Sequence, residues 1–410
     1  MKSVPHLPLA ALLSAALLAC APSAHADAVV DWNVRTAQFV IEAKMGTPPA
    51  VRAMAIVQTA VHGAVNAITG QHPALGPQPD AAPGASVDAA VAAVHRATLA
   101  KLMPAQQAAV DAAYAAAVAA IPEGPSKAAG IAVGERAAAL VLAARADDFA
   151  AVPDAYRPSV VAGAYVPTAA PAAASWPQRK PWLMPSAERF RPAPPPALTS
   201  ERWARDYEEV RTLGGKQSTR RTAEQTEIAR FWEFSLPSIY HGPVRSVAAV
   251  PGRDASGNAR LFAAVAQAMD DALIAIFDAK YHYHFWRPAT AIRNGDIDGN
   301  DATEREAGWT PFIETPLHPE YPSAHAVLAG AVGAVLKAEV GTKRMPVLST
   351  ASPSAKGAVR QWASVDDLVR EVADARVYEG VHYRVSTEVG AAMGQAVGEL
   401  AVARLLPTAQ

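Results

Sequence analysis

Apolar residues recur at helical spacing along the first part of the chain. Residues 27–150 are rich in alanine, which has the highest helix propensity, and their apolar positions repeat every three or four residues. Prolines and glycines interrupt this pattern and mark the ends of successive helices. We predict four helices in this N-terminal helical lobe, at residues 50–68, 88–102, 105–121 and 127–145.

The helical pattern stops at residue 151 and resumes near residue 200. Residues 151–200 contain eleven prolines, which exclude a regular helix, so we expect a long irregular connection over the surface. Alternating patterns typical of strands are nearly absent from the chain. The sequence therefore predicts an all-α fold of helical bundles, with a C-terminal helical domain at residues 201–410. The helices predicted there are at residues 200–213, 222–234, 258–286, 323–340, 364–378 and 386–405.

The N-terminus has the pattern of a secretory signal peptide. Lys2 precedes an apolar run at residues 7–19, and residues 24–26 form an Ala-His-Ala cleavage sequence. We therefore expect a signal peptide at residues 1–26 and an exported protein, periplasmic or secreted. The position of Cys20 leaves lipoprotein anchoring as an alternative. A membrane anchor is disfavoured because a span needs about 20 apolar residues.

Composition excludes several classes of protein. The 410 residues carry 37 Lys+Arg against 38 Asp+Glu, so no basic excess is available to neutralise the phosphates of a nucleic acid. Hydrophobic residues make up 51% of the chain, which is typical of a globular protein with a large core. The single cysteine excludes a disulfide scaffold and a zinc–thiolate site. After the N-terminal run, no transmembrane segment is predicted.

Lys280 and Arg287 form the first of three segments that stand out by their chemistry. They are seven residues apart, so on one helix they lie two turns apart on the same face, among aromatic residues. Pro288 forces that helix to end nearby. Two cations beside aromatic rings suit an anion held partly out of water. The alternative is a solvated basic face.

The second segment runs from His318 to His325, and its last four residues, Pro-Ser-Ala-His, lead directly into an apolar helix. Ser323 is a good N-cap, and the N–H groups and positive dipole of a first helical turn attract anions. His325 lies in the same turn. The alternative is an ordinary capped helix with an incidental histidine.

Arg376 and His382 form the third segment, with Gly380 between them, and we expect the pair to flank a turn between helices. Taken singly, His382 has the alternative of a buried structural role. Together the three segments supply cations, a hydroxyl, backbone N–H groups and two histidines, which suit a tetrahedral or trigonal-bipyramidal oxyanion. One histidine can bond or attack along the axis while the other handles a proton.

The order Lys-x6-Arg-Pro, Pro-Ser-x-His and Arg-x5-His resembles the three-part signature of the superfamily of vanadium-dependent haloperoxidases and type 2 phosphatidic acid phosphatases. The resemblance implies a fold built around helical bundles, with a vanadate- or phosphate-binding core in the C-terminal domain, and vanadate as the cofactor. It implies that His382 is the axial ligand of vanadium, or the nucleophile toward a phosphate ester, and that His325 is the acid–base residue. The residues implied to hold the oxyanion are Lys280, Arg287, Ser323, Ala324 through its N–H, and Arg376.

Two residues depart from the family pattern. Ala324 stands where the family has glycine, and this demands ordinary backbone angles at that position. Ser386, four residues after His382, stands where the family usually has an aspartate that orients the axial histidine. Loss of a group that orients a metal ligand commonly costs about 10–100-fold in affinity or activity. Glu388 is the candidate substitute nearby in the sequence.

The haloperoxidase branch is favoured by the large N-terminal lobe and by the aromatic residues beside Lys280, whereas the lipid phosphatases of the superfamily span membranes. The resemblance then implies that hydrogen peroxide oxidises a halide to hypohalous acid, with Lys280 polarising the peroxide and His325 accepting a proton. His318 lies seven residues before His325, where family members place a residue near the halide, and a histidine there indicates bromide or iodide.

Two alternatives to this activity stay open. One is an exported acid phosphatase that hydrolyses phosphate monoesters through a phosphohistidine, and the other is a non-catalytic oxyanion binder. The expected partners are hydrogen peroxide and halide, or a phosphate ester, with no nucleic acid. A homodimer that pairs through apolar helix faces is also left open.

Overall fold

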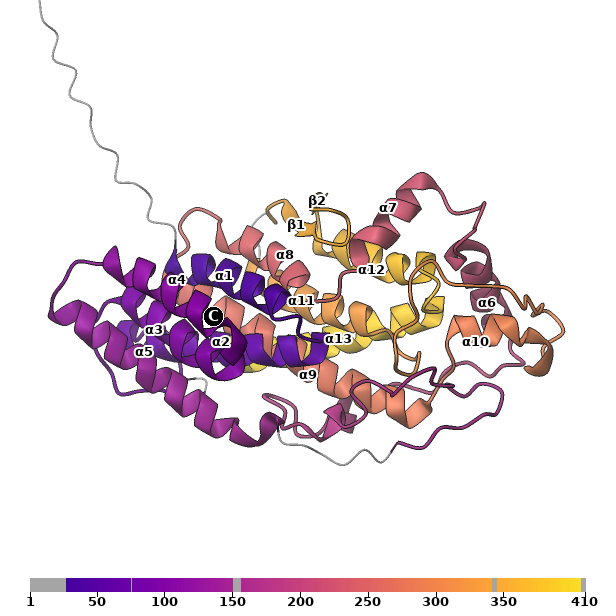
Figure 1. Ribbon diagram of the computed structural model, residues 1–410, viewed down its shortest axis with the longest axis horizontal. Coiled ribbons are helices and arrows are strands. Elements are labelled where there is room, and N and C mark those ends of the chain that lie inside the picture. Colours follow the sequence, from indigo (N-terminus) through magenta and orange to yellow (C-terminus); the bar gives the residue numbers. More distant parts are fainter. Residues whose placement is uncertain (1–26, 75, 150–155, 341–344, 407–410) are drawn as a thin grey trace, which may run out of the picture.

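The structure, a computed structural model, describes residues 27–74, 76–149, 156–340 and 345–406. The predicted signal peptide and Cys20 lie outside these residues. α-Helices are the dominant elements of the described chain (Figure 1). Its α-helices are α1 (Ala28–Glu42), α2 (Thr47–Thr69), α3 (Val87–Leu102), α4 (Gln107–Ala119), α5 (Pro125–Ala144), α6 (Glu201–Gly214), α7 (Ala223–Trp232), α8 (Ser238–Ala248), α9 (Ala255–Tyr283), α10 (Pro288–Arg293), α11 (Ala324–Val340), α12 (Val365–Tyr378) and α13 (Arg384–Leu405). Short 3-10 turns are η1 (Pro104–Gln106), η2 (Ala146–Phe149), η3 (Trp176–Gln178), η4 (Ala187–Phe190) and η5 (Gly295–Ile297).

These helices confirm the predicted all-α class, and every predicted helix has a counterpart. Helices α1, α8 and α10 were not predicted; α8 contains Pro243 and α10 has only six residues, so both lack a clear helical pattern. One antiparallel hairpin, β1 (Leu348–Ser352) with β2 (Ala358–Trp362), was also missed. Strand β1 has a single β-branched residue, Thr350, which leaves little strand signal.

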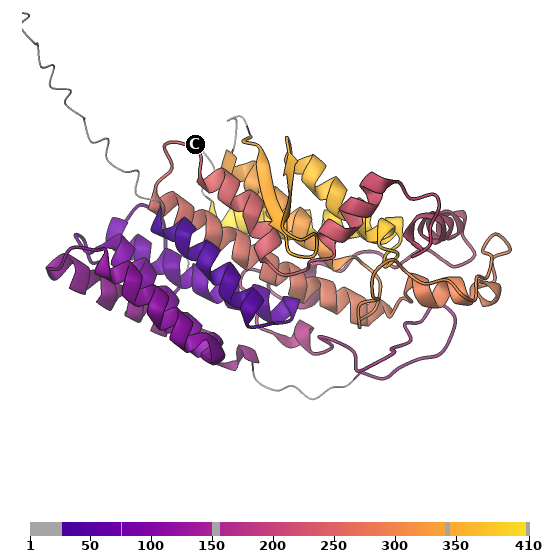
Figure 2. The same ribbon diagram turned by 45° about the horizontal axis from the view of Figure 1, so that its top comes forward.

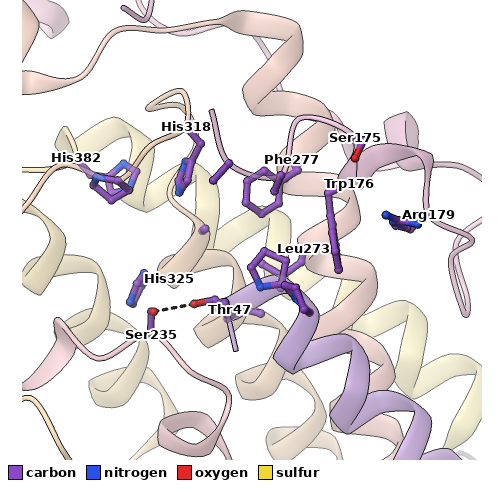
Figure 3. A pocket seen from close by; sticks show the side chains of 18 of the residues that line it. Thr47, Ser175, Trp176, Arg179, Ser235, Leu273, Phe277, His318, His325 and His382 are labelled. Carbon is purple, nitrogen blue, oxygen red and sulfur yellow. Dashed lines mark hydrogen bonds between the residues drawn. The ribbon is translucent and has the colours of Figure 1, made fainter. Parts of the chain in front are cut away.

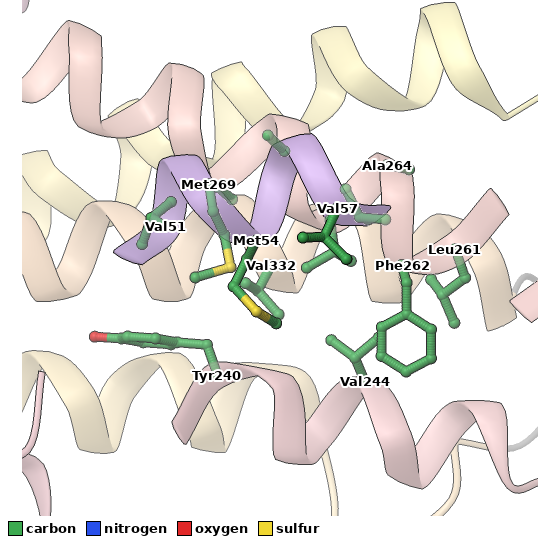
Figure 4. Packing of buried hydrophobic residues seen from close by; sticks show 14 of the residues in the cluster. Val51, Met54, Val57, Tyr240, Val244, Leu261, Phe262, Ala264, Met269 and Val332 are labelled. Carbon is green, nitrogen blue, oxygen red and sulfur yellow. The ribbon is translucent and has the colours of Figure 1, made fainter. Parts of the chain in front are cut away.

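Helix α9 is the central element of the fold. It runs for 29 residues and is buried along most of its length, where α2, α11 and α13 pack around it. Figure 4 shows part of this core, in which Met54 and Val57 of α2 meet Met269 of α9, with Tyr240 and Val244 of α8 facing them. A helix that is apolar on all sides must be enclosed by others. The apolar surface of α9 is therefore buried by the helices that pack around it.

Helices α1 to α5 gather at one end of the molecule, and α6 and α10 lie at the other (Figures 1 and 2). The apolar residues of α1 to α5 belong to the same hydrophobic core as those of α9 and α11, because α2 packs directly on α9. None of the described helices combines the length and the apolar character that crossing a membrane requires.

The described part of the proline-rich connection is irregular apart from η3 and η4, and it is tied to α9. Asp271 of α9 accepts hydrogen bonds of 2.7 to 2.9 Å from the backbone N–H groups of residues 182–184. Asp270, its neighbour, pairs at 2.6 Å with the buried Arg52 of α2. Trp176 is also buried, so the expectation of a connection that only covers the surface is wrong for this part.

Helices α11 and α13 cross in close contact beside α9. A Cβ at Gly394 of α13 would lie 1.9 Å from the carbonyl oxygen of Val327 in α11, so only glycine permits this approach. At the start of the crossing, the N–H of Ser323 donates to the carbonyl of Ser386 at 3.0 Å. The crossing therefore brings the second and third motifs together at one end of the two helices.

Candidate active site

A cavity of about 550 Å³ lies where the motif segments meet α9 and the proline-rich connection. Figure 3 shows three labelled histidines gathered at one end of it and Trp176 toward the other. The apolar part of the lining includes Leu273 and Phe277 of α9. The predicted site residues in the lining are His318, Ala324, His325, Arg376 and His382.

Helix α9 ends at Tyr283, before it reaches Arg287. His284 adopts a left-handed backbone conformation (φ 52°) as the C-cap, and Arg287 is extended because a residue that precedes proline disfavours the α region. The prediction of one helix over residues 258–286, with Lys280 and Arg287 on the same face, is therefore wrong. The two cations meet instead because the chain turns back after α9.

Lys280 and Arg287 converge on the segment that precedes α11. The Lys280 ammonium donates to the carbonyls of residues 319–320 at 2.9 and 2.8 Å. Arg287 donates from Nε to the carbonyl of His318 at 2.9 Å and from Nη1 to the carbonyl of Val381 at 2.8 Å. Both cations are buried. An ammonium has three N–H donors and a guanidinium has five, so each cation retains donors for a further acceptor.

Helix α11 begins at Ala324, directly after the buried Ser323. The Ser323 hydroxyl lies 3.5 Å from the N–H of Ala326, as expected of an N-cap residue. Ala324 is helical with negative φ, so the replacement of the family's glycine introduces no left-handed strain. His325 lies in the first turn of α11, and its Nε2 has no hydrogen-bond partner among the described residues.

Arg376 and His382 flank the turn between α12 and α13, as predicted. Gly380 makes this turn possible because it adopts φ 78°, a conformation that glycine reaches without steric cost. Arg376 forms an ion pair with Glu379 and donates from Nη1 to the carbonyl of Trp232 at 3.1 Å. The turn therefore presents a buried, anchored guanidinium and an imidazole to the same cavity.

A carboxylate that was not predicted, that of Glu320, contacts His382. Its Oε1 accepts from Nδ1 of His382 at 2.8 Å and from the N–H of Tyr383 at 3.1 Å. Its Oε2 accepts from the hydroxyl of Ser386 at 2.6 Å. Glu388, which we expected to replace the family's aspartate, is exposed and pairs with an arginine of α6. That expectation is wrong because Glu388 points away from the site, toward α6.

The contacts of His382 indicate which of its ring nitrogens carries the proton. Nη1 of Arg287, which can only donate, lies 3.3 Å from Nε2 of His382, so Nε2 carries the lone pair and Nδ1–H faces Oε1 of Glu320 at 2.8 Å. His318 differs, because its Nδ1 lies 3.0 Å from Nη2 of Arg287 and 3.2 Å from the carbonyl oxygen of Pro319, one a donor and the other an acceptor.

The site carries an excess of positive charge. Burial, together with the positive charge of the two arginines, holds the pKa of Lys280 well below its usual range. Burial and the nearby cations also lower the pKa of each of the three cavity histidines well below its usual value. Burial raises the pKa of Glu320 to about 7 and that of Glu379 to about 8. The arginines keep their charge, whereas burial favours the neutral forms of Lys280 and of both carboxylates, so the cluster is net positive and an anion would neutralise it.

The residues present fit an oxyanion such as vanadate or phosphate. Nε of Arg376 and Nε2 of His325 are buried polar atoms on the cavity lining that have no hydrogen-bond partner among the described residues. Buried polar atoms are normally paired, so both await a ligand atom. The remaining N–H donors of Lys280 and Arg287 supply charge-assisted hydrogen bonds, and His382 offers a nitrogen lone pair.

The two carboxylates of the site, Glu320 and Glu379, were missed by the sequence reasoning. Glu320 lies inside the second motif and Glu379 lies between the two residues of the third. Their positions beside the basic and histidine residues of the motifs were the signal that could have identified these carboxylates, because a buried cluster of positive residues requires negative charge nearby. The motif pattern alone does not say which of the surrounding acidic residues turns inward.

The chain resembles known proteins in sequence and in fold. Residues 260–409 match the family model of the VCPO second helical-bundle domain. Over 176 residues the chain is 30% identical to the vanadium chloroperoxidase of Curvularia inaequalis, an alignment that covers 36% of this chain and 29% of that enzyme's length. The structure of the first bacterial vanadium-dependent iodoperoxidase aligns with a TM-score of 0.78 at 24% identity, over 92% of this chain and 96% of that one. A bacterial vanadium-dependent chloroperoxidase in its apo form aligns with a TM-score of 0.71 at 17% identity, over 87% and 92%.

These likenesses differ in extent. The two solved structures establish the fold over most of the chain's length. The family model covers the region that contains all three motifs, residues 280–382. Residues 260–409 are therefore similar to the VCPO second helical-bundle domain, and the chain shares its fold with the two bacterial structures.

Proposed function

We propose that the protein is a vanadate-dependent haloperoxidase that oxidises bromide or iodide with hydrogen peroxide to hypohalous acid. The observation that carries the proposal is the gathering of three buried basic side chains, Lys280, Arg287 and Arg376, around His382, which lines the cavity together with Arg376. The match of residues 260–409 to the VCPO helical-bundle domain supports it. The proposal includes export of the protein through the signal peptide at residues 1–26.

The oxyanion site would be formed by the predicted residues. Bound vanadate would supply a Lewis acid that activates hydrogen peroxide. The cations neutralise the charge of the oxyanion in a buried setting, where charge-assisted hydrogen bonds are strong. His382 would bind the vanadium through the lone pair on Nε2. The residues that would hold its oxygens are Lys280, Arg287, Ser323, Ala324 through its N–H, and Arg376.

His325 is the proposed proton acceptor for incoming peroxide. It lies on the cavity lining, and its Nε2 has no hydrogen-bond partner among the described residues. Because burial lowers the pKa of His325, the ring is neutral and free to accept a proton. Lys280 keeps a free N–H with which to polarise the peroxide.

His318 is the proposed halide-side residue. It lines the cavity, its Nδ1 lies 3.0 Å from Nη2 of Arg287, and its ring packs edge-on against Phe277 with centroids 5.3 Å apart. A polar N–H at this position is consistent with bromide or iodide as the substrate. Replacement His318→Phe should change the ratio of bromide to iodide turnover, and an unchanged ratio would remove this residue from the proposal.

The test of the proposed function uses the protein without residues 1–26, freed of phosphate and supplied with or without orthovanadate. Bromide and iodide oxidation by peroxide and hydrolysis of an aryl phosphate are assayed side by side. We expect halide oxidation that requires vanadate, is lost in His382→Ala and persists in Glu388→Gln, an exposed control on α13. Hydrolysis that vanadate inhibits, without halide oxidation, would assign the chain to the phosphatases. Anion binding without either turnover would leave an oxyanion binder.

A further inference from the structure

We propose that Glu320 is the positioning residue for His382, in place of the aspartate that the superfamily usually carries where this chain has Ser386. The inference deepens the proposed function and rests on it for the identity of the bound oxyanion. It names a residue from the segment before α11, rather than from the helix after His382, as the one that orients the ring.

The contacts of the Glu320 carboxylate are those of an orienting group. One oxygen accepts from Nδ1 of His382 and from the N–H of Tyr383, the next residue. The other oxygen accepts from the hydroxyl of Ser386 at 2.6 Å. Three donors from one stretch of chain therefore hold a single carboxylate. They fix both the position of the carboxylate and the plane in which it can receive the imidazole N–H.

The main chain of Glu320 is also fixed on both sides. Its N–H donates to the carbonyl of Phe285 at 2.8 Å, and its own carbonyl accepts from the ammonium of Lys280 at 2.8 Å. The residue is fully buried. Because backbone and carboxylate are both anchored, the side chain cannot swing away from His382 without breaking several buried hydrogen bonds, each costly to leave unmade.

This anchoring sets the chemistry that His382 presents to the cavity. The contact with Glu320 keeps the proton on Nδ1, so the lone pair stays on Nε2, the nitrogen that lines the oxyanion site. A carboxylate that accepts from the far nitrogen also raises the basicity of a ligating imidazole. Without that carboxylate, the tautomer and the ring orientation are no longer fixed.

Ser386 explains why the aspartate is dispensable here. Its short hydroxyl side chain leaves room for the carboxylate of Glu320 and donates to it. An aspartate at position 386 would place a second buried carboxylate against the first, which is unfavourable because like charges repel at short range in a low dielectric. Glu320 and Ser386 therefore act as a pair, and exchanging both together should preserve the function that losing one destroys.

Two measurements test this role without relying on turnover. Nitrogen NMR of the histidine-labelled protein, with the His382 signals assigned through His382→Gln, reports which ring nitrogen carries the proton before any vanadate is added. Calorimetric titration with orthovanadate reports the affinity. The variants are Glu320→Ala, Glu320→Gln, the double variant Glu320→Ala with Ser386→Asp, and Glu388→Gln as the control.

We expect wild type and Glu388→Gln to show His382 protonated on Nδ1 alone and to bind vanadate equally well. Glu320→Ala should give a mixture of tautomers and bind vanadate about 10–100-fold more weakly, the usual cost of losing such a partner. The double variant should recover at least tenfold in affinity. Glu320→Gln keeps an acceptor for Nδ1–H but lacks the charge, so it should keep the tautomer and lose part of the affinity.

A structural role for Glu320 would give a different result. Unchanged tautomer and affinity in Glu320→Ala, or a double variant no better than the single one, would overturn the proposal. If Glu320→Ala does not fold, Glu320→Gln decides, and wild-type affinity in that variant would overturn the proposal as well. A wild-type protein that neither binds vanadate nor oxidises halide would refute the proposed function instead. The NMR result would still test the positioning of His382.

Discussion

Replacing Arg287 by lysine should destabilise the fold as well as the oxyanion site, although the charge is conserved. The guanidinium is 1% exposed and donates to the carbonyls of His318 and Val381 at 2.9 and 2.8 Å, from two different nitrogens. A lysine ammonium is a single point and cannot serve both carbonyls in the same geometry. At least one buried carbonyl loses its partner, at a cost of about 1–3 kcal/mol each. We therefore expect Arg287→Lys to lower the free energy of unfolding by about 1–3 kcal/mol for each carbonyl that it leaves unpaired.

Urea unfolding followed by circular dichroism at pH 7 measures this change. The midpoint should fall at unchanged m-value, since the surface exposed on unfolding is the same. Arg370→Lys is the matched control, because Arg370 is 66% exposed and pairs with the half-exposed Asp367. That control should change stability by less than about 0.5 kcal/mol. A loss for Arg287→Lys no larger than for Arg370→Lys would refute the reasoning from the buried carbonyls.

Three further predictions concern the scaffold. Gly394→Ala should lower the free energy of unfolding by about 1–3 kcal/mol or more, because its Cβ would meet a carbonyl of α11 at 1.9 Å, whereas Gly308→Ala, with open space around it, should have little effect in the same thermal unfolding assay. Burial lowers the pKa of His95 to about 4 and that of His241 to about 3. Below pH 6.5 the unfolded state binds protons at these histidines and the native state does not, so the free energy of unfolding decreases as the pH falls. Replacing either histidine by Gln should remove about 2 kcal/mol of the stability difference between pH 7 and pH 5, and an unchanged difference would contradict this. Asp271→Ala leaves three N–H groups of residues 182–184 without their acceptor, so limited proteolysis should cut the proline-rich connection faster than in wild type, and equal rates would show that this carboxylate does not hold it.

The parts of the fold that sequence predicted well are those governed by local pattern. Alanine-rich repeats, N-caps and prolines mark the helices, and Ser323 and Gly380 act where the pattern placed them, at a helix start and in a turn. The end of α9 was misjudged because a left-handed residue at His284 is decided by the fold and not by local propensity. The hairpin was missed because it is stabilised by packing against α8.

The candidate site was likewise predictable where residue type and spacing determine it, and unpredictable where the fold determines it. The motif residues were identifiable because their types and spacing carry the chemistry of oxyanion binding. The sequence does not show that Glu320, rather than Glu388, contacts His382. Glu388 is near His382 along the chain, whereas Glu320 is near it only in the folded structure. Glu388 is six residues away along the chain, whereas Glu320 is 62 residues away and reaches His382 only through the crossing of α11 and α13. Contacts between segments far apart along the chain are not readable from one sequence.

We propose that the three motifs form one oxyanion site in which His382 binds the vanadium. A crystal structure of the protein grown with orthovanadate tests this most directly, with the anomalous signal of vanadium locating the ion. The account predicts one vanadium atom per chain, bonded to Nε2 of His382, with Arg376 and Lys280 donating to its oxygens. Vanadium bound elsewhere, or a cavity that remains free of it at saturating orthovanadate, would contradict the account.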